Sequence, residues 1–232
     1  MTYYFDTLDS TNKYIKDHVS ELQDFDIVSA GFQTAGKGRN DHVWQGQANQ
    51  NIYSSIYIKN KDIVSSFNIL SIAIGVVVMK FLTPFCEKDK ISLKWPNDVY
   101  VNGQKICGIL LEGQLPNYVI AGIGININQN SFEIDNATSL SLLNSKTFDL
   151  NELRDDFHFH LLDELQNFND NKQDYIDAFN KHNYLLGKKV SFNYNGSPSE
   201  GIAGPINNDG SLQIQQGDKT INVFFDEVSI IR

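Results

Sequence analysis

The sequence has 232 residues, of which 41% are hydrophobic and 20% charged, and its formal net charge is −9 at pH 7. A chain of this length can bury one substantial core and a small extra domain. The acidic balance argues against general nucleic-acid binding, which needs a basic surface, but it does not exclude a nucleotide held by a few focused cations.

Targeting signals are not evident in the sequence. The chain does not begin with a basic stretch, an apolar run and a small-residue cleavage site, so we expect no secretory signal. The most apolar run, Phe67 to Phe85, is interrupted by polar residues and a proline, which predicts a buried helix and no membrane span. Cys86 and Cys107 make no disulfide framework, so a cytoplasmic location is expected.

The first third of the chain predicts strands and helices in alternation. Met1 to Leu8 can be an edge strand, and Asp9-Ser10-Thr11-Asn12 then offers N-cap residues for a helix. Strands are expected over Asp26 to Gln33 and over Ile52 to Ile58, with a polar, glycine-rich loop between them. The apolar run that ends at Thr83, just before a proline, completes this part as a helix.

An apolar hairpin is predicted in the middle of the chain. Ile91 to Val101 is expected to be a strand interrupted at Pro96, because proline gives a sheet no N–H donor. Asn102-Gly103 is a two-residue turn, and Gln104 to Gly113 returns as the second strand. Four polar residues lie within it, and a ligand is one way to satisfy them: Lys94, Asn97, Asp98 and Lys105.

The remaining chain first predicts a strand over Tyr118 to Asn128, a short helix or turn over Thr138 to Leu143, and two amphipathic helices between residues 153 and 179. After Leu185 short strands and turn signals follow instead. These strands are expected over Lys189 to Tyr194, Ile202 to Ile206, Leu212 to Gln216 and Ile221 to Ile231. The sequence therefore predicts an α+β protein with a mixed-sheet domain, residues 1–185, and a small all-β domain, residues 186–232.

A glycine-rich basic loop, Gly36-Lys37-Gly38-Arg39, is the first candidate for ligand binding. Glycines let backbone N–H groups approach an anion, and Lys37 and Arg39 add positive charge. A mobile surface loop is the alternative. The loop is not a P-loop, because Gly38 stands where that motif needs Ser or Thr, and Gly122-x-Gly124 lacks the third glycine of a dinucleotide fingerprint.

Two further groups of polar residues are weaker signals. Asp9-Ser10-Thr11-Asn12 can simply cap a helix, although beside Gln33 it also suits a neutral polar ligand. His158 and His160 lie two residues apart in a helical stretch and so point to different faces. No HExxH pattern is present among the five histidines, and no metal held by protein side chains is expected.

Taken together, five motifs resemble the ordered motifs of the biotin protein ligases, over residues 1 to about 130. They are Ser10-Thr11-Asn12, Gln33-Thr34-Ala35-Gly36-Lys37-Gly38-Arg39, Lys94-Trp95-Pro96-Asn97-Asp98, Lys105-x-x-Gly108-Ile109-Leu110 and Gly124-Ile125-Asn126. The resemblance implies a class II synthetase-like catalytic domain and, after Gly187, the small SH3-like C-terminal barrel of the family. Repressor members carry an N-terminal winged helix-turn-helix, which this sequence lacks, so the ligase-only class is expected.

The resemblance implies a reaction in two steps. Biotin reacts with ATP, brought with Mg²⁺, to give biotinyl-5′-adenylate, and a lysine of a biotin carboxyl carrier domain then takes the biotinyl group. Lys105 matches the family lysine between the biotin carboxylate and the phosphate, and Arg39 and Lys94 are further candidates for catalysis. Attack of one anion on another needs such cations. Asp98 is the candidate for orienting, or taking a proton from, the acceptor lysine.

The resemblance also implies a set of binding residues. Ser10, Thr11 and Gln33 would hold the ureido end of biotin, Trp44 would pack on the adenylate or anchor the loop, and Asn126 would lie near the adenylate. The remaining expected binding residues are Asn12, Gly36, Lys37, Gly38, Arg39, Asn97, Lys105 and Gly108. The sequence departs from the family at Asn40-Asp41-His42, where a carboxylate replaces a small or basic residue.

Two alternatives of different classes remain. One is a lipoate ligase or octanoyl transferase on the same scaffold, for which the polar ureido-binding residues would have no use. The other is a non-catalytic protein that senses biotin or a nucleotide, or a repressor, which the acidic charge opposes. A nucleic-acid or membrane partner is not expected, and the sequence leaves a homodimer open.

Overall fold

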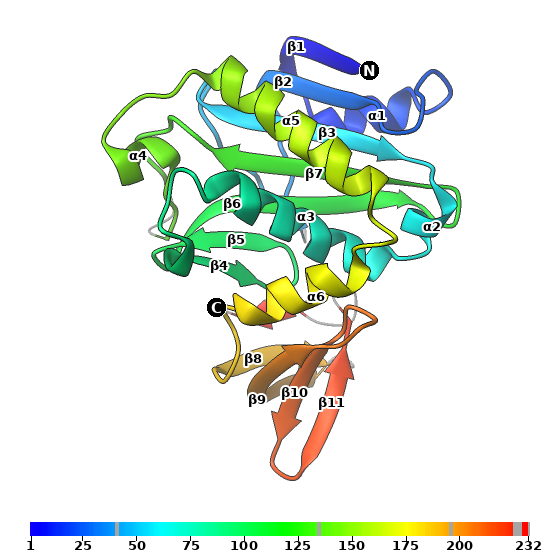
Figure 1. Ribbon diagram of the computed structural model, residues 1–232, viewed down its shortest axis with the longest axis vertical. Coiled ribbons are helices and arrows are strands. Elements are labelled where there is room, and N and C mark those ends of the chain that lie inside the picture. Colours follow the sequence, from blue (N-terminus) through cyan, green and yellow to red (C-terminus); the bar gives the residue numbers. More distant parts are fainter. Residues whose placement is uncertain (40–41, 134–135, 195–196, 225–228, 232) are drawn as a thin grey trace.

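The computed structural model contains two β-sheets and describes residues 1–39, 42–133, 136–194, 197–224 and 229–231 (Figure 1). The larger sheet has seven strands in the order β1-β2-β3-β7-β6-β5-β4. In it β1 and β2 run parallel, and every other neighbouring pair is antiparallel. The strands are β1 (Thr2–Leu8), β2 (Ile27–Gln33), β3 (Asn51–Ile58), β4 (Ile91–Lys94), β5 (Asp98–Val101), β6 (Gln104–Gln114) and β7 (Tyr118–Asn126).

Helices cover both faces of this sheet, because its central strands are apolar on both sides. Helices α3 and α5 cross one face and α1 lies on the other (Figure 1). The helices are α1 (Thr11–Asp17), α2 (Lys61–Val64), α3 (Phe67–Leu82), α4 (Leu140–Asn144), α5 (Leu150–Gln166) and α6 (Lys172–Lys181). None of the helices in the described part of the chain is long and apolar enough to cross a membrane.

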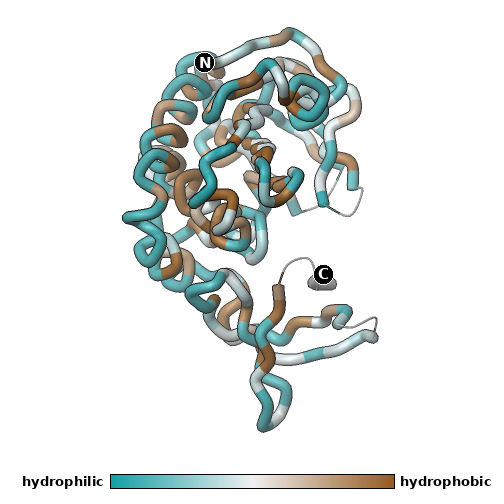
Figure 2. The backbone as a smooth tube through the Cα atoms, turned by 90° about the vertical axis from the view of Figure 1, so that its right-hand side faces the viewer, coloured by the Kyte–Doolittle hydropathy of each residue, from teal (hydrophilic) through white to brown (hydrophobic). Residues whose placement is uncertain are grey.

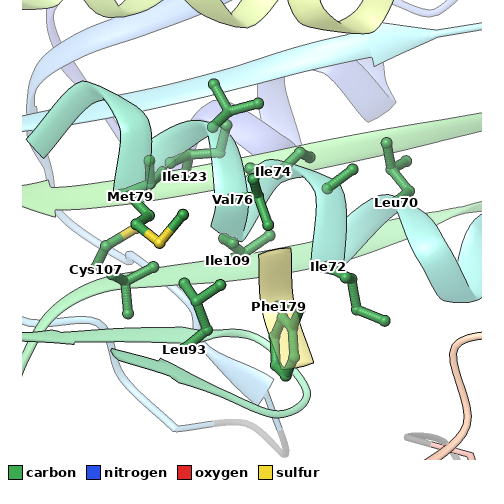
Figure 3. Close-up of a cluster of buried hydrophobic side chains, with 14 of the residues drawn as sticks. Leu70, Ile72, Ile74, Val76, Met79, Leu93, Cys107, Ile109, Ile123 and Phe179 are labelled. Atoms are coloured by element: carbon green, nitrogen blue, oxygen red, sulfur yellow. The ribbon is translucent and has the colours of Figure 1, made fainter. Parts of the chain in front are cut away.

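The main core lies where α3 passes between the sheet and α6. Its side chains meet those of β4, β6 and α6, and Figure 3 shows Met79 and Val76 of the helix above Cys107, Leu93 and Phe179. A fully buried apolar side chain of this size contributes roughly 1.5–3 kcal/mol. This packing explains why α3 is apolar along most of its length, as the sequence predicts. The helix also packs on β5 and β6, which carry part of the site described below.

The stretch predicted as one strand interrupted at Pro96 is instead a hairpin of two short strands. β4 and β5 pair antiparallel with Lys94 opposite Asp98, so the chain reverses direction around the proline. Proline can interrupt the hydrogen bonding of a strand, but it is also common in turns, and here it lies in the turn between β4 and β5. The next turn is confirmed: Asn102 and Gly103 have φ of 52° and 76°, the positive values that a type I′ turn needs.

The second sheet is antiparallel, with the order β11-β10-β9-β8-β12, and lies at one end of the molecule (Figure 2). Its strands are β8 (Lys189–Tyr194), β9 (Ser197–Ile206), β10 (Leu212–Gln216), β11 (Lys219–Val223) and β12 (Ser229–Ile231). The single strand predicted over residues 221–231 is therefore wrong. β11 pairs with β10 and β12 pairs with β8, so the chain crosses to the other edge of the sheet between them. The predicted α+β class is confirmed.

A set of hydrogen bonds joins the second sheet to the first domain. The indole N–H of Trp95 donates to the carbonyl of Gly210 at 3.1 Å. Asn180 at the end of α6 exchanges two hydrogen bonds with the backbone of Ile206, at 3.0 and 2.8 Å. Trp95 is buried, so the small sheet is tied directly to the β4–β5 turn.

Candidate active site

One cavity of about 870 Å³ is lined by segments that lie far apart in the sequence. They are the start of α1, the end of β2 with the loop after it, the β4–β5 turn, and the adjoining parts of β6 and β7. The predicted site residues that line it are Ser10, Thr11, Asn12, Gln33, Lys37, Gly38, Arg39, Trp44, Lys94, Asn97, Asp98, Lys105, Gly108 and Asn126. Gly36 lies behind the wall and accepts a hydrogen bond from the Trp44 N–H at 2.9 Å.

One end of the cavity is neutral and polar. The side-chain oxygen of Gln33 accepts hydrogen bonds from the Thr11 backbone N–H at 2.7 Å and from the Thr11 hydroxyl at 3.0 Å. The amide nitrogen of Gln33 is therefore turned away from Thr11 and can donate to a ligand. Ser55 on β3 lies behind, with its hydroxyl 2.6 Å from that of Thr11. Ser55 could not be recognised from the sequence, because a serine in an alternating strand belongs to no motif.

The other end of the cavity is charged. Lys105 and Asp98 form an ion pair with a 2.5 Å separation between Nζ and Oδ1, and their side chains are only 15% and 9% exposed. The Lys105 ammonium also lies 5.2 Å from the centre of the Trp44 ring. Lys37 and Arg39 line the same cavity from the loop. Together with Lys94 these residues give the cavity a lining of four cationic side chains, which suits an anionic ligand.

Backbone hydrogen bonds fix the position of Lys105 from both sides. Its N–H donates to Asn136 O at 3.0 Å, and its carbonyl accepts from Thr138 N–H at 2.9 Å. Asn126 supports this segment by donating from its amide nitrogen to Thr138 O at 3.0 Å. Asn97 acts in the same way on the other side, with its amide nitrogen 2.8 Å from Ile109 O. Both asparagines therefore shape the wall of the cavity through its backbone.

The Lys94 side chain is directed toward Tyr100, which is not among the residues that line the cavity. Its ammonium lies 3.5 Å from the Tyr100 hydroxyl and 5.4 Å from the centre of that ring. Tyr100 in turn stacks on Tyr184, with ring centroids 4.9 Å apart. The structure thus brings Lys94 to the cavity, as the sequence predicts, but engages it differently from Lys105.

The floor of the cavity is built from glycines and one indole ring. A Cβ atom at Gly108 or at Gly124 would lie 2.6 Å from the ring of Trp44, so only glycine lets the ring rest on β6 and β7. The indole nitrogen of Trp44 is buried and has no hydrogen-bond partner among the described residues. A buried donor without a partner is costly, and a ligand acceptor would satisfy it.

A polar strip that the sequence analysis missed closes one side of the cavity. Gln45 donates to Glu133 at 2.7 Å, and Gln47 donates to Ser131 at 3.2 Å. These contacts span more than eighty residues between side chains that form no motif, so only the folded chain brings them together. Of the departure Asn40-Asp41-His42 noted above, the first two residues lie outside the described residues, and His42 lines the cavity.

The buried cysteine of β6 lies outside the cavity lining. Burial raises the pKa of the Cys107 thiol, which keeps it neutral and weakly nucleophilic. No cluster of three or more His, Cys, Asp or Glu that could hold a metal ion is found in the part of the chain that the structure describes.

Comparison with known proteins identifies the family. Residues 4–130 match the model of the biotin/lipoate A/B protein ligase family. The chain belongs to this family. It is 32% identical to a biotin–[acetyl-CoA-carboxylase] ligase of Mycobacterium tuberculosis over 96% of this chain and 86% of that protein. It is 30% identical to the bifunctional ligase/repressor BirA of Salmonella typhimurium over 90% of this chain and 68% of that protein.

A solved ligase structure superimposes over the whole length of this chain. A biotin protein ligase from Aquifex aeolicus in complex with biotin and ATP superimposes with a TM-score of 0.86 and 25% identity, covering 100% of this chain and 98% of that one. The match includes the second sheet, so both parts of the architecture are shared with that ligase. The fold class predicted from the sequence and the family predicted from the motifs are confirmed.

Proposed function

We propose that this chain joins biotin to a lysine of a biotin carboxyl carrier domain, with ATP as the source of energy and biotinyl-5′-adenylate as the intermediate. The observation that carries the proposal is the polarity of the cavity, which is neutral and hydrogen-bonding at Thr11 and Gln33 and cationic at Lys105. Biotin has the same polarity, with a neutral ureido ring at one end and a carboxylate at the other. The similarity to ligases named for biotin supports this assignment.

In the first step an oxygen of the biotin carboxylate attacks the α-phosphorus of ATP, and the bond to the β-phosphate breaks to release pyrophosphate. Negative charge builds on the α-phosphate oxygens, so cations around it lower the barrier. Lys105 is proposed to bridge the carboxylate and that phosphate, with Lys37 and Arg39 offsetting the remaining charge. Mg²⁺ is proposed to arrive with ATP and to keep much of its water.

In the second step the neutral amine of the acceptor lysine attacks the acyl carbon, and AMP leaves. The attacking amine must lose a proton, and Asp98 is the proposed acceptor or orienting group. Asp98 already pairs with Lys105, so we propose that the pair separates or shares its charge once the adenylate is present. Residues 186–232 are proposed as a separate domain that helps to close the nucleotide site or to receive the carrier.

The deciding experiment measures pyrophosphate release by the purified chain with ATP and, in turn, biotin, lipoate and octanoate. We expect release with biotin alone among the three, followed by labelling of a carrier domain. Release with lipoate or octanoate and none with biotin would move the chain to the other branch of its family. Binding of biotin without any release of pyrophosphate would identify a sensor.

A further inference from the structure

A chain of buried hydrogen bonds runs from the far side of β6 to the polar end of the cavity. The Asn12 amide nitrogen donates to a carboxylate oxygen of Glu112 at 2.7 Å. The hydroxyl of Ser55 lies 2.6 Å from Asn12 Oδ1 and 2.6 Å from Thr11 Oγ1. Ser55 is 0% exposed and Asn12 5% exposed, so water does not complete these bonds. The directions of the bonds must therefore be consistent within the protein.

The carboxylate of Glu112, 2.7 Å from the Asn12 amide nitrogen, is the nearer of the two acceptors that set those directions; the other is the Leu110 carbonyl, 3.5 Å from the same amide nitrogen. A carboxylate can only accept, so Asn12 must turn its amide nitrogen toward Glu112 and its amide oxygen toward Ser55. An amide oxygen can only accept as well, so the single proton of Ser55 is committed to Asn12. The Thr11 hydroxyl donates to the side-chain oxygen of Gln33 at 3.0 Å, and Thr11 Oγ1 faces the same Ser55 hydroxyl that donates to Asn12.

Thr11 therefore keeps its proton inside the protein, on Gln33, and offers only lone pairs to the cavity. The side-chain oxygen of Gln33 is already taken by the Thr11 N–H, so Gln33 offers its N–H donors. These N–H donors have no hydrogen-bond partner among the described residues. The pair thus fits a ligand that carries an N–H beside a C=O, as a cyclic urea does.

We propose that Glu112 is a positioning residue that determines ligand specificity: through Asn12 and Ser55 it makes Thr11 an obligate hydrogen-bond acceptor for a ligand N–H. The inference rests on the proposed function, in which that N–H belongs to the ureido ring of biotin. Glu112 does not line the cavity and acts only through the intervening residues. Without its charge the amide of Asn12 can turn over and donate to Ser55. The Ser55 proton then goes to Thr11 alone, and the Thr11 proton can turn from Gln33 to the ligand.

The simpler role for Glu112 is to fasten α1 to the sheet through its ion pair with Lys16. That pair is partly exposed, with the Lys16 side chain 42% exposed and that of Glu112 25% exposed, so its contribution to stability is small. The packing of Asn12 supports the specificity role instead. A Cβ atom at Gly122 would lie 2.4 Å from Asn12 Oδ1, so glycine at this position makes room for the amide that joins Glu112 to Ser55.

The test measures binding by calorimetry without ATP, for the full chain and its variants. The ligands are biotin, desthiobiotin, and the two cyclic carbamate analogues of biotin in which one or the other ureido N–H is replaced by oxygen. The wild type should discriminate strongly against the carbamate whose oxygen faces Thr11. Glu112→Gln should bind biotin about tenfold more weakly and lose most of this discrimination, while the ratio for desthiobiotin stays unchanged.

Two further variants separate specificity from structure. Lys16→Gln removes the ion pair but keeps Glu112, and we expect wild-type affinities and ratios. The double variant Asn12→Asp with Glu112→Gln exchanges donor and acceptor between the two positions and still gives Ser55 an oxygen to donate to. It should restore the discrimination that Glu112→Gln loses, a coupling that a double-mutant cycle measures.

Several outcomes would overturn the inference. One is that Glu112→Gln discriminates between biotin and the carbamate as strongly as the wild type. Another is that Lys16→Gln loses this discrimination to the same extent as Glu112→Gln. The third is that the double variant folds but does not regain the discrimination. Thermal unfolding establishes that each variant is folded, and the double variant tests the idea even if Glu112→Gln proves unstable. A wild type that does not bind biotin at all would overturn the proposed function as well, which is a distinct result.

Discussion

The Lys105 ammonium is positioned in the cavity by side-chain contacts as well as by its backbone hydrogen bonds. Lys105 Nζ and Asp98 Oδ1 lie 2.5 Å apart, and both side chains are largely shielded from water. Removing either partner of such a pair leaves a buried charge without compensation, which is destabilising. The same lysine faces the Trp44 ring. A ligand carboxylate and phosphate would therefore find a cation that is oriented and only weakly hydrated.

This arrangement predicts that Lys105→Ala abolishes adenylate formation. Loss of a cation at the phosphate should lower pyrophosphate release about a hundredfold or more, because the charge that develops there is no longer stabilised. The matched control is Lys94→Ala, whose ammonium lies against Tyr100 and whose loss should matter less. Melting curves check that both variants fold. A pyrophosphate rate for Lys105→Ala above that of the control would remove Lys105 from the chemistry.

Single residues also show how far the sequence can predict a site. Thr11, Gln33 and Lys105 could be found because each stands in a motif of fixed spacing. Ser55 and Glu112 could not, since a serine in a strand and a glutamate near the end of a strand carry no signal of their own. Their importance arises from contacts with Asn12 across forty-three and one hundred residues of sequence, which only the folded sheet creates.

Among the elements, β6 and β7 shape the cavity because each has a glycine, without a Cβ atom, beneath the Trp44 ring. Gly124→Ala would add a Cβ atom 2.6 Å from the Trp44 ring, so the ring must move. We expect weaker binding of biotin and ATP together and a changed tryptophan emission. Gly75→Ala on α3 is the matched control, because its nearest neighbours are 3.8 Å away and alanine favours a helix. Similar binding by both variants would show that the ring position is unimportant.

The contact between α5 and β3 predicts a dependence of stability on pH. Burial, together with the charge of Arg154, lowers the pKa of His158 to about 4, and its ring bonds to Ser54 at 2.7 Å. The unfolded chain therefore binds a proton that the folded chain rejects. Stability is complete above pH 6.5 and falls as the pH drops toward 4, by on the order of 3 kcal/mol at most.

Urea unfolding between pH 8 and pH 4 measures this effect. His158→Gln should flatten the fall in the free energy of unfolding relative to the wild type. His160→Gln is the control, because His160 lies two residues further along the same helix and is exposed beside Asp156. Equal pH dependence in the wild type and His158→Gln would show that the buried ring does not control acid stability.

Element boundaries were predictable where hydrophobic periodicity decides them. The amphipathic helices α5 and α6 and most strands were found in this way. The reversal at Pro96 and the split of residues 221–231 were not, because both depend on which strand pairs with which. Pairing is settled by tertiary contacts that a local pattern does not contain.

At the scale of the whole molecule, the junction between the two sheets reaches the catalytic region through Trp95. This residue stands between Lys94 and Asn97 in sequence, and its indole N–H donates to Gly210 in the second sheet. Gly210 has φ of 86°, and a Cβ atom there would lie 2.7 Å from Asn68 O on α3. The second sheet therefore rests on the same turn that positions the wall of the cavity.

Gly210→Ala should consequently impair the enzyme as well as its stability. Gly217→Ala is the matched control: it also has a positive φ, 59°, but nothing lies within 4 Å of an added Cβ. Both variants carry a backbone penalty of about 1–2 kcal/mol, while only Gly210→Ala forces the junction apart. We expect Gly210→Ala to slow biotin transfer to the carrier by about tenfold, while Gly217→Ala loses some thermal stability but transfers biotin at nearly the wild-type rate. Faster amide exchange around residue 210 should accompany the change. If both variants transfer biotin equally well, the second sheet is attached to the catalytic domain without acting on it.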